Sequence, residues 1–150
     1  MEENCSFIKL KNGRQKQRQG GTMTDYQSHG THVFLDYNGY DCEEENQGEW
    51  MLKVLQHAVS HAKAREVHAH VSSFDGSVSP IGFAAVVLID ESHVTAHCYS
   101  ERGWLAIDCF TCGESDPNIM ADFIHERLNE SMPNLKLMQR QEVARFLHGA

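Results

Sequence analysis

The middle of the chain gathers, at short spacing, residue types that can do covalent chemistry. Glu91, Ser92 and His93 are consecutive between two apolar runs, His97 follows them, and Cys112 lies further along. A hydroxyl beside a carboxylate and an imidazole can act as a nucleophile with a base next to it. An ordinary polar turn is the alternative, because serine favours such positions. The Gly-x-Ser-x-Gly frame of hydrolase nucleophile elbows is missing from this segment, so that class of enzyme is not indicated.

Cysteines and histidines elsewhere give only weak metal-site signals. Five cysteines form an odd set in a chain without an export signal, so we expect reduced thiols. Cys109 and Cys112 make a single C-x-x-C pair, whereas a structural zinc site needs four ligands, and we predict that Cys109 packs in the core. Two histidine pairs have spacings that can bind metal, His57 with His61 and His68 with His70. No carboxylate pattern accompanies them, so we predict no metal site.

Composition and charge narrow the class of protein. The chain has 150 residues, of which 41% are hydrophobic, and a formal net charge of -8. This length is enough for one domain with its own core. The acidic balance argues against nucleic acid or an anionic membrane as the main partner. No apolar run approaches the roughly 20 residues of a membrane-spanning helix, and no signal peptide is evident. We expect a small cytoplasmic enzyme.

The sequence pattern predicts a polar tail followed by one domain. Residues 1–29 are rich in Gln, Gly and basic side chains with little apolar periodicity, which is typical of a flexible tail. The domain is expected over residues 30–150. Alternating, β-branched or apolar runs predict strands over 31–37, 67–74, 83–90, 93–99, 105–110 and 135–139. Helical periodicity predicts a helix over 48–65 and a second helix that Asp116 caps, with Pro117 in its first turn and Pro133 as its stop. A short amphipathic end is predicted at 143–147.

This order of elements predicts an α+β fold. Short connections favour a mainly antiparallel sheet with both helices on one face. The run at 83–90 is almost continuously apolar, as expected of a strand buried on both faces or at a subunit junction. The second face of the sheet would then need a cover, and a second copy of the chain can supply it. We therefore predict a homodimer, an α/β/β/α sandwich.

Residues 82–113 resemble, nearly throughout, the signature of the compact bacterial and archaeal S-adenosylmethionine decarboxylases, a self-processing pyruvoyl enzyme family. The E-S-H at 91–93 matches the cleavage motif, His97 follows at the expected spacing, and D-x-F-T-C-G at 108–113 matches the closing motif. Outside this segment, Gly30-x-His32 and Asp41 also fit. The resemblance covers roughly residues 30–123.

The resemblance implies a chemistry in which the chain makes its own cofactor. The Ser92 hydroxyl would attack the Glu91 carbonyl, and elimination would cut the chain between the two residues and leave a pyruvoyl group at position 92. That ketone would form a Schiff base with a substrate amine and accept the electrons released with carbon dioxide, so no diffusible cofactor is needed. By resemblance, Cys112 is the proton donor to the product carbon and His97 transfers protons during self-processing.

The position of His97 bears on the assembly. Five residues of extended strand span about 16 Å, so a regular strand cannot bring His97 to Ser92 of the same chain. Either the strand bends or the histidine comes from a second protomer. We favour the second protomer, because the family has sites at subunit interfaces and one sheet face needs a cover.

Departures from the family pattern concern processing and substrate. Ala84 stands where the family has a serine that assists cleavage. Tyr99 stands where tryptophan is usual and Val78 where phenylalanine is expected, and these positions stack the substrate's adenine. Glu101 would meet the ribose hydroxyls or a cationic group of the substrate.

S-adenosylmethionine is the family's default substrate, in polyamine synthesis, and ornithine or arginine are the alternative substrates. An unprocessed, non-catalytic binding or regulatory paralogue is the other class of function, and a zinc-binding module is a distant third.

Overall fold

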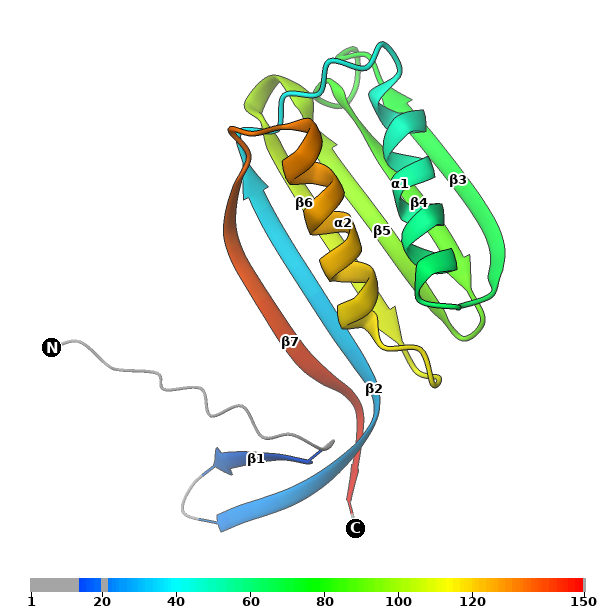
Figure 1. Cartoon of the computed structure of the whole chain (residues 1–150). Helices are drawn as coiled ribbons and strands as arrows, with labels where there is room; N and C mark the ends of the chain where they lie inside the picture. The colour runs from blue at the N-terminus through cyan, green and yellow to red at the C-terminus, as the bar shows by residue number, and fades with distance from the viewer. Residues whose placement is uncertain (1–13, 20–21, 150) are drawn as a thin grey trace, which may run out of the picture.

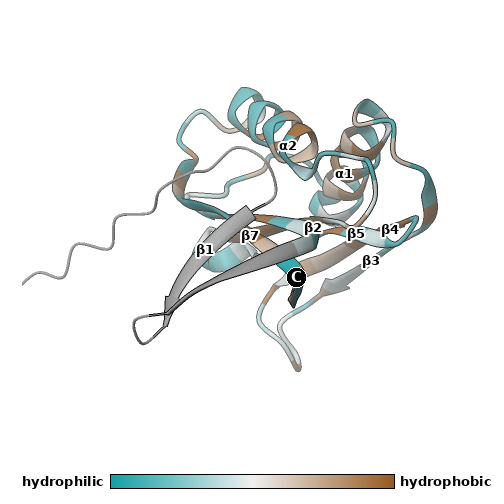
Figure 2. Cartoon of the chain, turned by 90° about the horizontal axis from the view of Figure 1, so that it is seen from below, coloured by the Kyte–Doolittle hydropathy of each residue, from teal (hydrophilic) through white to brown (hydrophobic). Residues whose placement is uncertain are grey.

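The computed structural model describes residues 14–19 and 22–149, and in them two helices cover one face of a single sheet (Figure 1 and Figure 2). The sheet has seven strands in the order β1-β2-β6-β5-β4-β3, with β7 paired to β2, and every pairing is antiparallel. The predicted α+β class, with both helices on one face, is therefore confirmed. The association of two such sheets stays a prediction.

The elements follow the predicted order. The strands are β1 (Arg14–Gln19), β2 (Thr22–Asn38), β3 (Glu66–Phe74), β4 (Gly82–Ile89), β5 (Ser92–Tyr99), β6 (Trp104–Thr111) and β7 (Lys136–Gly149). The helices are α1 (Gln47–His61), α2 (Pro117–Ser131) and the short 3-10 turn η1 (Ser100–Arg102). None of the helices in the described part of the chain is both long and apolar enough to cross a membrane.

The core lies between the helices and one face of the sheet. Alternate residues of the three central strands point toward the helices and are buried, for example Val87, Val94 and Ile107. The intervening residues of β4 face the opposite side, where Ala84 and Val86 are half-buried and Leu88 is 43% exposed. The continuous apolar run of β4 therefore has one face in the core and one on the uncovered side of the sheet.

Both helices begin at side-chain caps. The Asn46 side chain accepts a hydrogen bond from the Glu49 N–H at the start of α1, and the Asp116 side chain accepts one from the Asn118 N–H at the start of α2. Pro117 occupies the first turn of α2, where its missing N–H has no cost, as predicted. This helix ends at Ser131, shortly before Pro133.

Helix α1 ends at His61, four residues before the predicted Arg65. The Ala64 N–H donates to the Val59 carbonyl oxygen and the Lys63 N–H to that of Ser60, both at 3.0 Å. These two bonds form a Schellman cap, in which the residue after the helix takes the left-handed conformation. Lys63 has φ 57° and fills this position without being glycine, so no helix-stop residue marks this end of α1.

We expect Lys63→Gly to stabilise the protein. A left-handed conformation costs an L-residue roughly 1–2 kcal/mol, and glycine avoids that cost while losing more freedom on folding. The net gain should be about 0.5–1 kcal/mol, seen as a higher midpoint in urea unfolding with an unchanged slope. Lys53→Gly, inside α1, is the matched control and should destabilise by about 1 kcal/mol. A lower midpoint for Lys63→Gly would contradict the left-handed cap.

The N-terminal region differs from its prediction as a flexible tail. β2 begins at Thr22, and β1 pairs with residues 22–27 of β2. The tail interpretation of residues 1–29 is therefore wrong for 14–19 and 22–29, while residues 1–13 and 20–21 lie outside the described residues. Strand pairing uses backbone groups, so this extension forms without the apolar periodicity that the sequence analysis looked for.

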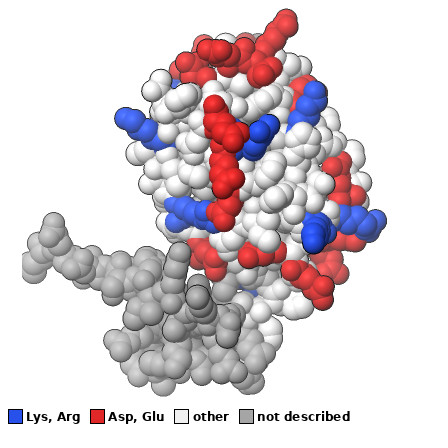
Figure 3. All heavy atoms as spheres, viewed as in Figure 1, with Lys and Arg blue, Asp and Glu red and all other residues white. Residues whose placement is uncertain are grey.

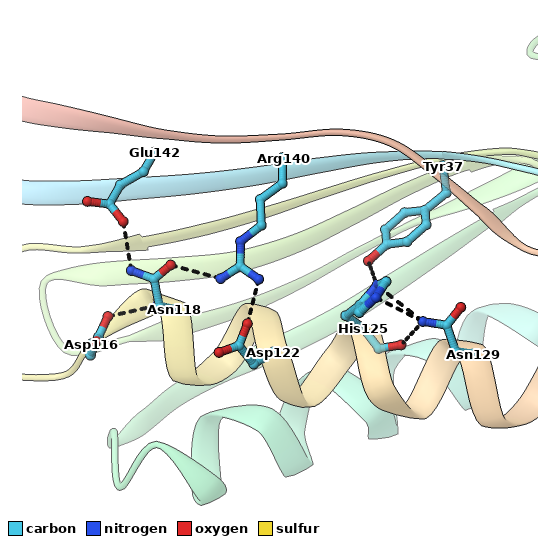
Figure 4. Close-up of polar contacts among 8 residues, drawn as sticks. All are labelled: Tyr37, Asp116, Asn118, Asp122, His125, Asn129, Arg140 and Glu142. Carbon is cyan, nitrogen blue, oxygen red and sulfur yellow. Dashed lines mark hydrogen bonds and ion pairs between the residues drawn. The ribbon is translucent and has the colours of Figure 1, made fainter. Parts of the chain in front are cut away.

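The C-terminal region forms one long strand in place of the predicted short strand and separate amphipathic end. β7 pairs with β2 from Asn38 to Tyr26, with a bulge next to Tyr37. Polar bonds attach β7 to α2, as Figure 4 shows. Arg140 bonds Asp122 and Asn118, and the Asn118 amide also donates to Glu142. These side chains face the helix, so β7 lacks the alternation of apolar and polar residues by which strands are recognised.

Candidate active site

The segment Glu91–Ser92 lies at the tip of the β4–β5 hairpin. Ile89 pairs with Ser92, so Asp90 and Glu91 form a two-residue connection. Glu91 has φ 61°, in the left-handed region. An L-residue pays roughly 1–2 kcal/mol for this conformation, and such strain persists only where the surroundings impose it. The peptide bond that follows Glu91 is the predicted cleavage site.

Cys112 contacts both residues of this bond. Its backbone N–H donates to the Ser92 Oγ atom at 2.9 Å, and its thiol donates to the Glu91 carbonyl oxygen at 3.0 Å. The antiparallel pairing of β5 with β6 produces this contact, because His93 is opposite Phe110 and the residues beyond these come together at the strand ends. A donor on that oxygen stabilises the negative charge that forms there when a nucleophile attacks the carbonyl.

His97 is remote from this cluster. It lies on β5 between Ala84 of β4 and Ala106 of β6, and the register of both pairings continues without a shift from Ser92 to Tyr99. A regular strand separates residues 92 and 97 by about 16 Å. No register shift or bulge in either pairing shortens this separation, and the supply of His97 by a second protomer stays a prediction. The His97 side chain is exposed on the uncovered face of the sheet.

The predicted substrate-binding residues gather at the opposite end of β5 from Ser92. Tyr99 ends the strand and is 46% exposed, Glu101 is in η1, and Val78 is 96% exposed in the β3–β4 loop. The Ser100 N–H donates to the Ile81 carbonyl oxygen, which joins this loop to η1. Within one chain, therefore, these residues and His97 do not meet Ser92.

Trp104 is an aromatic residue of this end that the sequence analysis missed. It pairs with Tyr99, and the two rings meet edge to face with centroids 6.4 Å apart. The Arg102 guanidinium lies 5.0 Å from the centre of the Trp104 ring. The strand pairing creates this platform, and single-sequence reasoning had no signal for the register.

A polar cluster lies on the uncovered face between the two ends of β5. His32 Nε2 and Asp108 Oδ1 are 2.8 Å apart, and the Thr95 hydroxyl donates to the other Asp108 oxygen at 3.3 Å. Arg145 of β7 lies 3.3 Å from His32 Nδ1. Burial, followed by the neighbouring His32, lowers the pKa of His93. Asp108 and His32 belong to the motifs noted in the sequence, whereas Arg145 depends on the β2–β7 register.

The described cysteines are free thiols, and three of them are buried. Cys109 is fully buried, as predicted, and burial raises the pKa of its thiol. Burial likewise raises the pKa of Cys98 to about 11. Cys112 alone of the four is partly exposed, so it is the thiol among them that is open to solvent. Cys5 lies outside the described residues, and within the described ones no three His, Cys, Asp or Glu side chains form a metal-binding group.

On the helix-bearing face, acidic side chains gather at the end that carries the β2–α1 loop and also form a column down the middle of the face (Figure 3). The exposed Glu43, Glu44 and Glu45 belong to that loop. The basic groups visible on this face lie apart from one another, between acidic groups.

Comparison with known proteins defines the class to which this fold and hairpin tip belong. The family model described as S-adenosylmethionine decarboxylase matches residues 31–141. A relative from Bacillus velezensis, named S-adenosylmethionine decarboxylase proenzyme, is 37% identical over 102 residues, which are 67% of this chain and 76% of the relative. Another of that name, from Anoxybacillus flavithermus, is 40% identical over 101 residues, 66% of this chain and 77% of the relative.

A solved structure agrees with the sequence relatives. The adenosylmethionine decarboxylase of Aquifex aeolicus is similar with a TM-score of 0.64 and 27% identity, over 79% of this chain and 91% of that one. The match is to pyruvoyl-dependent carboxy-lyases. The chain belongs to the S-adenosylmethionine decarboxylase family, which confirms the resemblance seen in its motifs.

Proposed function

We propose that this protein is a self-processing decarboxylase that acts on S-adenosylmethionine and supplies polyamine synthesis. The observation that carries the proposal is the contact of Cys112 with both residues of the Glu91–Ser92 bond, through its N–H and its thiol. The names of the relatives favour S-adenosylmethionine over ornithine or arginine. The cytoplasmic location stays a prediction.

Self-cleavage would consume one water and release ammonia. The Ser92 Oγ atom attacks the Glu91 carbonyl carbon, the C–N bond to Ser92 breaks, and an ester replaces the amide. Removal of the Ser92 Cα proton then breaks the Cβ–Oγ bond, and Glu91 leaves with a free carboxylate. The dehydroalanine left at position 92 adds water and loses ammonia, which gives the pyruvoyl group. The thiol of Cys112, 3.0 Å from the attacked carbonyl oxygen, would stabilise the first step.

The residues around position 92 fit a pyruvoyl group. Ser92 is the first residue of β5, whose alternate residues are buried in the core. The Cys112 N–H donates to the Ser92 Oγ atom in the uncut chain, and after that oxygen leaves with Glu91 the same N–H could donate to the ketone oxygen at position 92. When formed, the ketone would supply the electron sink for loss of carbon dioxide. Departure of the Glu91 carbonyl would release the Cys112 thiol, which could then hold the proton that the product carbon needs. No diffusible cofactor enters this scheme.

A homodimer with shared sites would complete the catalytic centre. Ser92 and Cys112 lie at one end of β5, whereas His97, Tyr99 and Glu101 lie toward the other. A twofold axis that lies between two uncovered faces and runs across the strand direction would place each end of one chain against the opposite end of its partner. Exposed apolar side chains on this face support such packing, among them Leu88, Tyr99, Trp104 and Val143.

We expect Ala84→Ser to accelerate self-cleavage. Ala84 and His97 are cross-strand partners on the uncovered face, with Cβ atoms of such pairs about 5 Å apart, so a serine hydroxyl there would lie within reach of the imidazole. One added proton-transfer group contributes roughly 10²-fold or more when it is well placed, and we expect at least about tenfold here. A mass-spectrometric time course of freshly purified precursor measures it. Val86→Thr adds a hydroxyl on the same face of β4 opposite Thr95 and not opposite His97, so it is the control for simple polarity. An unchanged rate for both variants would contradict the assistance.

Two measurements on the unmodified chain test the proposed function. Intact-mass analysis should find one fragment ending at Glu91 and a second that begins with a pyruvoyl group at position 92. Release of labelled carbon dioxide should then be faster from carboxyl-labelled S-adenosylmethionine than from ornithine or arginine. Val78 has no aromatic face, so the affinity for S-adenosylmethionine should be weak, since one stacked aromatic is worth roughly 1–3 kcal/mol. An uncut chain after long incubation would support a non-catalytic paralogue instead.

A further inference from the structure

The hairpin tip that carries Glu91 is attached to the segment before β3 through one arginine. The Asp90 N–H donates to the Arg65 carbonyl oxygen at 3.1 Å. The Arg65 side chain also forms an ion pair with Asp90, with Nε 2.7 Å and Nη2 2.6 Å from Asp90 Oδ2. Arg65 therefore binds Asp90 through its backbone and through its side chain. Asp90 directly precedes the strained Glu91.

Side-chain packing does not impose the conformation of this tip. Asp90 and Glu91 are both exposed, and a cavity of about 290 Å³ lies against them. Its walls include Lys63, Arg65, Ser92 and Thr111. Two-residue hairpin connections normally take turns with a positive φ at the first residue or at both. Here only the second residue, Glu91, has one, so the polar contacts on either side must hold it.

The two contacts act from opposite sides. Cys112, beyond the end of β6, holds Glu91 and Ser92, and Arg65 holds Asp90. The Arg65 backbone is held on both sides, because the Schellman cap of α1 precedes it and Glu66, which pairs with Ile89 of β4, follows it. Arg65 is thus placed between the end of a helix and the start of a strand.

We propose that Arg65 is a positioning residue for self-cleavage, which keeps Glu91 in its left-handed conformation so that its carbonyl oxygen stays on the Cys112 thiol. This inference rests on the proposed self-cleavage between Glu91 and Ser92. Both partners of the Arg65–Asp90 ion pair are exposed, and exposed pairs add little to global stability. The contact should therefore affect the rate of cleavage and leave the melting temperature unchanged.

Cleavage of the Arg65→Gln precursor tests this role. Its first-order rate constant, from intact-mass time courses of freshly purified chain, should fall about three- to fivefold, which corresponds to about 0.7–1 kcal/mol in the barrier, the upper range for an exposed ion pair. Arg65→Lys keeps the charge and should recover part of the rate. Arg127→Gln removes the exposed Arg127–Glu130 ion pair of α2 and is the matched control, which should cleave at the unmodified rate.

The same Arg65→Gln change, made in a chain that also carries Glu91→Gly, separates a positioning role from general destabilisation. Glycine adopts a positive φ without cost, so in a Glu91→Gly chain Arg65→Gln should no longer slow cleavage. Equal slowing in both backgrounds would overturn the proposal, and so would an Arg65→Gln chain that cleaves at the unmodified rate while the unmodified chain is cut after Glu91. A failure of the unmodified chain to cleave at all would instead remove the proposed function, and this inference with it.

Discussion

Ser92→Ala is expected to leave the chain uncut and without decarboxylase activity. Alanine has no hydroxyl to attack the Glu91 carbonyl, and without the cut no ketone forms at position 92. The loss should be complete within detection, because both the nucleophile and the later electron sink come from this one side chain. Intact-mass analysis and release of labelled carbon dioxide measure the two losses on the same sample.

Two controls make this result specific. Ser60→Ala changes an exposed serine of α1 and should cleave and decarboxylate as the unmodified chain does. The melting temperature of Ser92→Ala should stay close to that of the uncut precursor, since Ser92 is at a hairpin tip and has one hydrogen bond from Cys112. Fragments from a Ser92→Ala chain that still end at residue 91 would mean that another group performs the cut.

Mixing Ser92→Ala chains with His97→Ala chains is expected to restore cleavage that neither shows alone. His97 lies five residues after Ser92 on a strand whose pairing with β4 has no register shift, a separation of about 16 Å, so we expect it to act on the partner's Ser92. In a mixed dimer, one site would combine Ser92 of the His97→Ala chain with the partner's His97. Only the His97→Ala chain should therefore be cut, and with random pairing about half of it.

Differently tagged, co-expressed chains make this measurement direct, because intact masses then assign each fragment to its parent. The matched control mixes His97→Ala with the double variant Ser92→Ala, His97→Ala, which supplies no histidine and should restore nothing. If His97 acts within its own chain, or takes no part, the first mixture will behave like this control.

The central half of the fold follows from local sequence patterns. Asp116 with Pro117 predicted the start of α2, and the apolar runs around Ser92 predicted β4 and β5 within a residue or two. Patterns fail where backbone pairing or local conformation decides the structure. β1 and the first part of β2 pair without apolar alternation, Lys63 ends α1 where glycine is usual, and β7 presents Arg140 and Glu142 to α2.

The candidate site, like the fold, contains residues that the sequence predicted and residues that only the structure identifies. The motif residues Glu91, Ser92 and Cys112 were found from the sequence, and strand register brings them into contact. The distance of His97 followed from strand geometry alone. Trp104 and Arg65 had no sequence signal, because each acquires its partner from a different strand or loop. Motif spacing therefore finds residues that share a segment, and only the fold finds those that support them.

In the cut protein, strands from the two pieces of the chain would alternate within one sheet. The segment before the cut would contribute β1, β2, β3 and β4, and the segment after it β5, β6 and β7 (Figure 1). In the sheet these alternate: β2 lies between β6 and β7, and β4 lies beside β5. Neither piece could leave with an intact half of the sheet. After self-cleavage, each protomer would be two interleaved chains, whose refolding is an encounter of separate molecules and whose stability depends on their concentration.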